Sequence, residues 1–184
     1  MKAVSRPALL YHGGKWKLAP WVITHMPAHR FYVEPFGGGA SVLLRKPRSY
    51  GEVYNDLDSE VVNVFRILRD PERALQLTRL LEMTPFARDE FNQAYEPAAD
   101  ELEQARRTII KSFMGFGADA VHRRAASIVG MRSKPSSWKA TTGMRSSVKR
   151  SGTTPATDWS RYPSLIGDFT ARLQGVVIEN RDAV

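Results

Sequence analysis

The fold is decided by one stretch of the sequence: Phe31-Tyr32-Val33-Glu34-Pro35-Phe36-Gly37-Gly38-Gly39-Ala40-Ser41. Its first five residues form a short aromatic and β-branched run, which predicts a strand over residues 31–35. The glycines that follow let the backbone turn sharply and let a ligand approach the main chain closely. Residues 40–46 then predict a short helix, closed by Pro47, whose first N–H groups suit a phosphate or a carboxylate. The stretch therefore predicts a ligand-binding turn between a strand and a helix.

A second strand is predicted over residues 51–55, and Asp56 follows it twenty positions after Phe36. In nucleoside-binding α/β folds, an acid at this place accepts hydrogen bonds from ribose hydroxyls. Three glycines alone often form nothing more than a loop, but together with Asp56 they indicate a nucleoside-containing cofactor. The glycine pattern is not G-x-G-x-x-G, so a dinucleotide is not favoured, and the sequence has no P-loop G-K-[ST].

The rest of the chain carries mostly helical signals. Asp58-Ser59 and Asp70-Pro71 are cap and start signals for two helices, and Thr84-Pro85 repeats the second signal. The other predicted elements are a helix over residues 99–114, a basic loop over 133–157, a helix over 163–173 and a strand over 176–180. This order predicts an α/β sheet domain interrupted by a mainly helical insertion.

Composition narrows the class of protein. The chain has 184 residues, enough for one domain with a core. It has no cysteine, which excludes a disulfide scaffold, a thiolate metal site and a cysteine nucleophile, and fits a reducing cytoplasm. No apolar run is long enough to span a bilayer, and the N-terminal stretch does not read as a signal peptide. The four histidines show no ligand spacing, so we expect no metal site.

The formal net charge is +8, and it is unevenly distributed. Residues 1–50 carry eight Lys or Arg and one acid, and residues 119–161 carry nine and two. The block between them, residues 51–118, carries eight bases and thirteen acids. A polyanion such as nucleic acid would bind the basic blocks. On charge alone, a basic surface that only keeps the protein soluble is an equal alternative.

Several blocks taken together resemble one family. They are YHGGKWKLA (11–19), FYVEPFGGGASV (31–42), YNDLDSEVVNVFRIL (54–68), SFMGFGADA (112–120), GMRSSVKRSGTTPATDW (143–159) and VVIENRDA (176–183). This combination resembles the Dam-type adenine-specific DNA methyltransferases, particularly their phage-borne members. The resemblance implies a partial Rossmann-like sheet, S-adenosylmethionine as the cofactor and methylation of the exocyclic amine of adenine. It also implies double-stranded DNA as the partner, no membrane, and the cytoplasm of a bacterial or phage-infected cell.

The resemblance assigns roles to individual residues. Tyr11 and Lys15 fall on the family's N-terminal cofactor motif, where Lys15 would approach the methionine carboxylate, although a Gly-Gly-Lys turn alone is more often a plain turn. The remaining cofactor positions are Phe36, Gly37 and Gly39 on the glycine loop, Asp56 at the ribose and Asp182 near the adenine. By the same resemblance, residues 1–58 and 162–184 belong to the cofactor-binding α/β part. Residues 59–161 would form the target-recognition insertion.

The basic segment of that insertion is the expected DNA contact. Its cations would mainly meet phosphates, which position the duplex without reading its sequence. Trp138 would either stack at a base step or anchor its loop to the core. The expected contact residues are Arg123, Arg124, Arg132, Lys134, Trp138, Lys139, Arg145, Lys149, Arg150 and Arg161.

The sequence departs from the family in its catalytic motif. The family places Asp-Pro-Pro-Tyr after a fourth strand, whereas no two of the eleven prolines here are adjacent and the sequence given ends at Val184. In the family the fourth strand lies beside the first, so we expect the strand at 31–35 to be an exposed apolar edge. The expectation is a chain that has no catalytic residues of its own. It would either need a second polypeptide for the missing strands or be a truncated gene product with no activity. The alternative is a non-catalytic DNA-binding module with a vestigial cofactor pocket.

Overall fold

The computed structural model describes residues 3–115, 143–145 and 152–184. Within them, three parallel strands form one sheet in the order β1 (Phe31–Glu34), β2 (Gly51–Asn55) and β3 (Val176–Glu179). The helices are α1 (Ala19–Thr24), α2 (Ser41–Arg45), α3 (Ser59–Arg69), α4 (Pro71–Glu82), α5 (Arg88–Gln93), α6 (Glu101–Met114), α8 (Pro155–Ser160) and α9 (Ile166–Leu173), with a 3-10 turn, η2 (Pro163–Leu165), before α9. The chain is therefore an α/β protein, as predicted.

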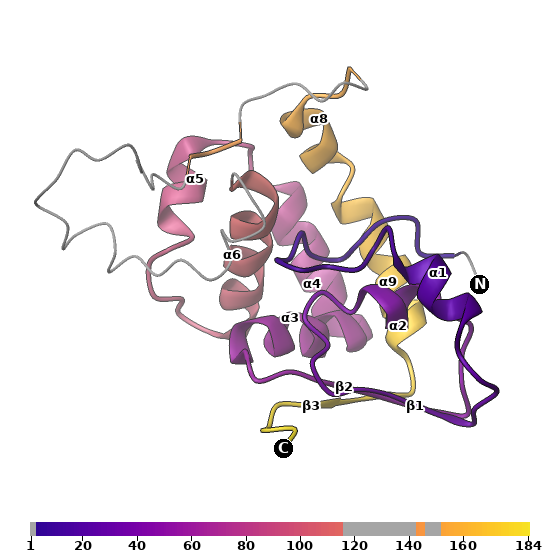
Figure 1. Cartoon of the computed structure of the whole chain (residues 1–184). Coiled ribbons are helices and arrows are strands. Elements are labelled where there is room, and N and C mark those ends of the chain that lie inside the picture. The colour runs from indigo at the N-terminus through magenta and orange to yellow at the C-terminus, as the bar shows by residue number, and fades with distance from the viewer. Residues whose placement is uncertain (1–2, 116–142, 146–151) are drawn as a thin grey trace, which may run out of the picture.

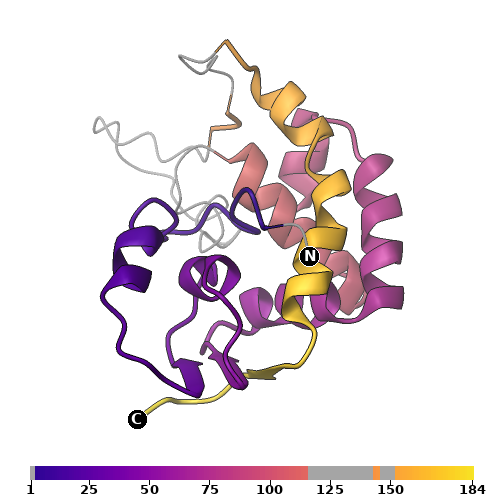
Figure 2. The same cartoon turned by 90° about the vertical axis from the view of Figure 1, so that its right-hand side faces the viewer.

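All of these helices lie on the same side of the sheet (Figure 1). The sheet forms the bottom layer of that view, and the C-terminus leaves it after β3. Figure 2 shows the same arrangement from the side. None of the helices in the described part of the chain is long and apolar enough to cross a membrane.

The two faces of the sheet differ accordingly. The face toward the helices holds Tyr54 and Ile178, which are buried. On the other face, strand register aligns Val33, Val53 and Val177 in one row across the three strands. Val33 is 54% exposed and Val177 is 48% exposed. This open row is an apolar surface that no described helix covers. It is unusual, because parallel sheets are normally covered on both faces.

Strand β1 lies at one edge of the sheet. It pairs with β2 on one side and with no described strand on the other. Phe31 is 65% exposed, and its ring meets Tyr50 edge-on. The prediction of an exposed apolar edge at residues 31–35 is confirmed for the described residues.

Local capping explains where the long helices begin. The Asp58 carboxylate accepts hydrogen bonds from the Glu60 and Val61 N–H groups, and Asp70 does the same one helix later, with Pro71 in the first turn. Both predicted starts are confirmed. The predicted start at Thr84-Pro85 is wrong, because the Thr84 hydroxyl donates back to the Leu80 carbonyl of α4 and α5 begins only at Arg88.

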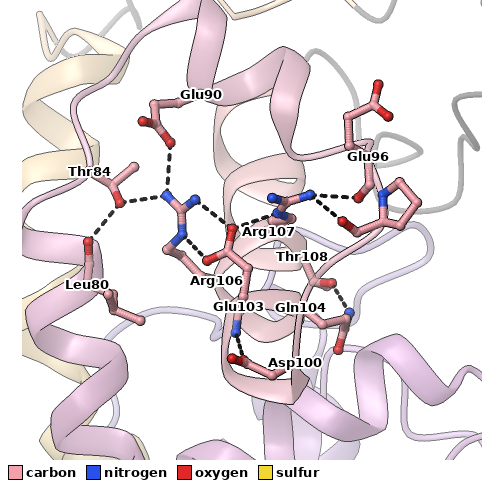
Figure 3. A network of polar contacts seen from close by, with 11 residues as sticks. Leu80, Thr84, Glu90, Glu96, Asp100, Glu103, Gln104, Arg106, Arg107 and Thr108 are labelled. Carbon is pink, nitrogen blue, oxygen red and sulfur yellow. Dashed lines mark hydrogen bonds and ion pairs between the residues drawn. The ribbon is translucent and has the colours of Figure 1, made fainter.

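A polar network joins helices α5 and α6 (Figure 3). The Arg106 guanidinium on α6 donates to Glu103, to Glu90 of α5 and to the Thr84 hydroxyl, at 2.7 to 3.0 Å. Arg107 donates to Glu103 at 2.6 Å and to two loop carbonyls. The pKa of Glu103 is lowered chiefly by the hydrogen bond from Arg106. The network fixes α5 on α6.

The predicted basic loop at 133–157 lies largely outside the described residues. Where the chain is described again, the prediction is wrong for its last residues, because α8 begins at Pro155 with the Thr154 hydroxyl as its cap. Helix α8 is held by Trp159, which is buried and donates its indole N–H to the Thr84 carbonyl. A search for helical periodicity does not detect such a contact between residues far apart in the sequence.

Candidate functional site

A cavity of about 460 Å³ opens at the carboxyl end of β1. Its volume lies within the range of ligand-binding pockets. Its walls come from two separate stretches, residues 11–15 and residues 32–39, together with Ser41 and Val42 of α2. Five of the seven cofactor residues expected from the sequence line this one cavity: Tyr11, Lys15, Phe36, Gly37 and Gly39.

The glycine loop is clamped between two tyrosine rings. A Cβ atom on Gly37 would lie 2.2 Å from Cε2 of Tyr54, and one on Gly38 would lie 2.8 Å from Cε1 of Tyr11. Gly38 also has a φ of +47°, a left-handed conformation that favours glycine. The next turn is closed by Ala40, whose φ of +50° is unusual for a residue with a side chain. Glycine is thus required at 37 and 38 by close contacts and backbone shape.

Asp56 is joined to this loop directly. Its Oδ2 accepts a hydrogen bond from the Gly38 N–H at 2.7 Å, and its Oδ1 accepts one from the Asp58 N–H at 2.9 Å. The carboxylate is half-buried and lies beside the glycine loop rather than among the residues that line the cavity. Each oxygen keeps a second acceptor position for a ligand hydroxyl.

The ends of all three strands are tied together at this point. The Asn55 side-chain amide donates to the Pro35 carbonyl after β1 and to the Arg181 carbonyl after β3. The Asn180 amide donates to the Asp56 carbonyl at 2.8 Å. The segment that contains Asp182 is therefore beside Asp56. The Asp182 side chain itself is exposed and accepts from the Val184 N–H.

Lys15 lies at the mouth of the cavity. Its exposed ammonium donates to the Gly13 carbonyl within the same turn. Gly14 has little room, since a Cβ there would lie 3.0 Å from the Tyr11 carbonyl oxygen. The turn at 13–15 thus brings one cation to the cavity with its charge facing solvent.

Glu34 is the acid on the cavity wall. One carboxylate oxygen accepts from the Tyr32 hydroxyl and from the Leu43 N–H, both at 2.8 Å, while the other is buried with no partner among the described residues. Burial raises the pKa of Glu34, and burial together with Glu34 raises the pKa of Tyr32. Burial followed by the Asp56 charge raises the pKa of Tyr11. Sequence reasoning had not assigned Glu34 to the site. The signal available was an acid on a strand that ends at the glycine turn.

A buried ion cluster forms around Glu52 of β2. Glu52 on β2 accepts from Lys46 at 2.7 Å and from both terminal nitrogens of Arg172 at 2.7 and 2.9 Å. All three side chains are at most 4% exposed. Burial would raise the pKa of Glu52, but the hydrogen bonds from Arg172 and Lys46 outweigh it and lower that pKa. The cluster ties β2 to the end of α2 and to α9.

Most of the expected DNA contacts fall outside the described residues. These are Arg123, Arg124, Arg132, Lys134, Trp138, Lys139, Lys149 and Arg150. Arg145 is described: its N–H donates to the Met114 carbonyl, beside a bridge between Gly115 and Met144. This pairing places residues 143–145 against the end of α6. Arg161 is exposed at the end of α8.

Comparison with known proteins agrees with the geometry of the cavity. A search of curated proteins finds no match to the chain. The model of the D12 class N6 adenine-specific DNA methyltransferase family matches residues 11–124. The matched region begins at the tyrosine over the glycine loop and includes the cavity and Asp56. It covers more than half of the sequence, and the chain therefore belongs to the D12 class N6 adenine-specific DNA methyltransferase family.

Proposed function

We propose that this chain binds S-adenosylmethionine in the cavity beside Gly37–Gly39 and forms the cofactor-binding part of an adenine-specific DNA methyltransferase. The observation that carries the proposal is the hydrogen bond between the Gly38 N–H and Asp56. It joins the glycine turn of β1 to the acid that follows β2, at the carboxyl ends of parallel strands. Ligands of α/β sheets bind at that edge, and the family match includes it.

The residues present suit this cofactor. Asp56 would accept hydrogen bonds from the ribose hydroxyls, and Lys15 would approach the methionine carboxylate. Tyr11, Phe36, Gly37 and Gly39 would form the cradle, in which Gly38 is already closed against the Tyr11 ring. The buried Glu34 oxygen that has no partner among the described residues is an acceptor on the cavity wall. Asp182 would lie toward the adenine. When bound, the cofactor supplies an electrophilic methyl group for the exocyclic amine of adenine.

The division of labour along the chain is part of the proposal. Residues 1–58 and 162–184 would form a partial Rossmann-like sheet around the cofactor. Residues 59–161 would approach double-stranded DNA with their basic segment, whose cations neutralise phosphates. An enzyme of this kind would act in the cytoplasm of a bacterial or phage-infected cell.

The catalytic residues would come from outside these 184 residues, and a second polypeptide is the source that we propose. The sequence contains no Asp-Pro-Pro-Tyr. Two features of the sheet support an added unit: the free edge of β1 and the open row Val33, Val53 and Val177. From β1 to β3, each strand is added on the same side of the one before it, and the described helices lie on one face of the sheet (Figure 1). A strand added beyond β1 reverses that direction, so a right-handed connection would place its helix on the open face.

The test is binding of S-adenosylmethionine by calorimetry, together with transfer of a labelled methyl group to adenine-containing DNA. Asp56→Ala should weaken cofactor binding at least tenfold. Asp100→Ala, which removes a helix cap remote from the cavity, should leave binding unchanged. DNA binding by Asp56→Ala should keep the salt dependence of the wild type.

Three results would change the proposal. A folded chain that binds DNA but not the cofactor would favour the alternative of a DNA-binding module with a vestigial pocket. Equal loss of cofactor and DNA binding in Asp56→Ala would contradict the division of labour. Methylation of adenine by this chain alone would refute the need for a second polypeptide.

A further inference from the structure

The backbone of Gly38 is held at both of its polar groups, which belong to two neighbouring peptide units. Its N–H donates to Asp56 Oδ2 at 2.7 Å, and its carbonyl accepts from the Tyr54 hydroxyl, also at 2.7 Å. Tyr54 is completely buried, and Gly38 is buried as well. Tyr54 and Asp56 are two residues apart at the end of β2, so the same strand holds the loop through both of its polar groups.

The Tyr54 ring has no freedom to leave this position. On one side it touches Gly37, at the place where a Cβ would lie only 2.2 Å from the ring. On the other side it packs on Phe65 of α3, with ring centroids 4.6 Å apart. Burial, followed by the charge of Asp56, keeps the pKa of Tyr54 well above its usual value, so the hydroxyl stays a donor.

Removing the Tyr54 hydroxyl would release the loop at one atom. The Gly38 carbonyl would be buried without its donor, and the peptide could rotate to find water. The carbonyl lies in the Gly38–Gly39 peptide and the N–H in the Gly37–Gly38 peptide, and the two are joined at the Gly38 Cα. A change in the Gly38 backbone angles would therefore also shift the Gly38 N–H relative to Asp56. The carboxylate would then keep only the Asp58 N–H as an orienting contact.

We propose that Tyr54 is a positioning residue for the cofactor: its hydroxyl fixes the Gly38 backbone, which in turn orients the Asp56 carboxylate. The inference rests on the proposed function of Asp56 at the ribose. Tyr54 acts through the loop and Asp56 rather than by touching the cofactor, and it is not among the residues that line the cavity. Preorganised sites bind more tightly because less order has to be imposed on binding.

The chain offers a matched control. Tyr162 is also completely buried, and its hydroxyl donates to the Ala8 carbonyl at 2.7 Å. Tyr54→Phe and Tyr162→Phe each remove one buried hydroxyl from a backbone carbonyl. Both variants should lower stability to a similar extent in urea denaturation. A purely structural role for Tyr54 would make the two variants alike in every other measurement.

The experiment compares the two variants in amide hydrogen exchange and in S-adenosylmethionine affinity. We expect Tyr54→Phe alone to speed exchange at the Gly38 and Ala40 amides and to weaken binding about five- to tenfold, the size of one lost hydrogen bond. In an Asp56→Ala background, Tyr54→Phe should change affinity less than about twofold, because the path through Asp56 is gone.

The outcomes separate the two proposals. If the wild-type chain binds the cofactor and Tyr54→Phe binds it equally well, the inference is overturned while the proposed function stands. An equal loss of affinity in Tyr162→Phe would also overturn it, since the effect would then be general destabilisation. No binding by a folded wild-type chain would remove the proposed function and the inference with it.

Discussion

Gly37→Ala is the most direct test of the packing beneath the glycine loop. The added Cβ would lie 2.2, 2.5 and 3.0 Å from three atoms of the Tyr54 ring. Ordinary contact needs more than about 3.4 Å, so the ring would have to retreat by more than about 1 Å. The Phe65 ring packs against the Tyr54 ring, with ring centroids 4.6 Å apart, and any retreat would stretch the hydrogen bond from Tyr54 to Gly38.

The expected cost follows from these two effects. Overpacking of a tight core costs about 1–3 kcal/mol, and a strained or lost hydrogen bond adds about 1 kcal/mol. We therefore expect Gly37→Ala to lower the free energy of unfolding by about 2–4 kcal/mol. That is a large part of the 5–15 kcal/mol typical of a domain. Cofactor affinity should fall as well, because the loop moves with the ring.

Equilibrium urea denaturation, followed by tryptophan fluorescence, measures this change. Gly167→Ala is the control, since Gly167 lies in α9 with open space around it and alanine favours helix. It should be neutral or stabilising by up to about 1 kcal/mol. In a Tyr54→Val background, which removes the ring, the cost of Gly37→Ala should fall below about 1 kcal/mol. An equal cost in both backgrounds would refute the reasoning.

Four further variants, two of them with a matched control, probe the charges and caps of the fold. Glu52→Gln leaves two buried cations without their carboxylate and should cost about 3 kcal/mol or more, whereas Glu101→Gln, in an exposed pair with Arg73, should cost less than about 1 kcal/mol. Because the folded-state pKa of Glu52 is lowered, its stabilisation is present above about pH 4.3 and is lost as pH falls through the folded pKa. Urea titrations between pH 5 and 3 should show the gap between wild type and Glu52→Gln closing, and a constant gap would contradict the assignment. Arg106→Met should loosen the contact of α5 with α6, so proteolysis between residues 84 and 100 should become faster. Arg73→Met, which removes an exposed ion pair, is the control and should be cleaved more slowly there. Equal cleavage of the two variants would count against the network. Asp58→Ala removes the α3 cap and should cost about 1 kcal/mol in thermal or urea unfolding, as should Asp70→Ala for α4; no loss in either would argue against capping.

Local signals in the sequence were sufficient for much of the fold. The strands at 31–35, 51–55 and 176–180 were predicted correctly because their β-branched and aromatic runs are visible in the local sequence. The caps at Asp58 and Asp70 were predicted correctly because each depends on groups within a few residues. The same local rule failed at Thr84. There the hydroxyl completes the preceding helix instead of starting the next one.

The candidate site was predicted in part. The spacing between the glycine turn and Asp56 can be read directly from the sequence. The structure joins the two through the Gly38 N–H. The roles proposed for Lys15 and Asp182 came from the family resemblance and remain predictions. The strand pattern places Tyr54 on the same inner face as Glu52. Its role was nevertheless missed, because an aromatic residue on a strand is most simply explained as part of the core.

By itself, then, the sequence determined the α/β class, the glycine turn between a strand and a helix, and the family to which the chain belongs. The tertiary structure alone decided which groups meet: the Tyr54 hydroxyl with the Gly38 carbonyl, and Glu52 with Arg172, 120 positions away. It also decided that the described helices all lie on one face of the sheet and leave the other uncovered. The physical reason is that such contacts depend on strand register and helix packing, which are set by many weak interactions between distant segments. Turns and caps, in contrast, are fixed by strong interactions between near neighbours.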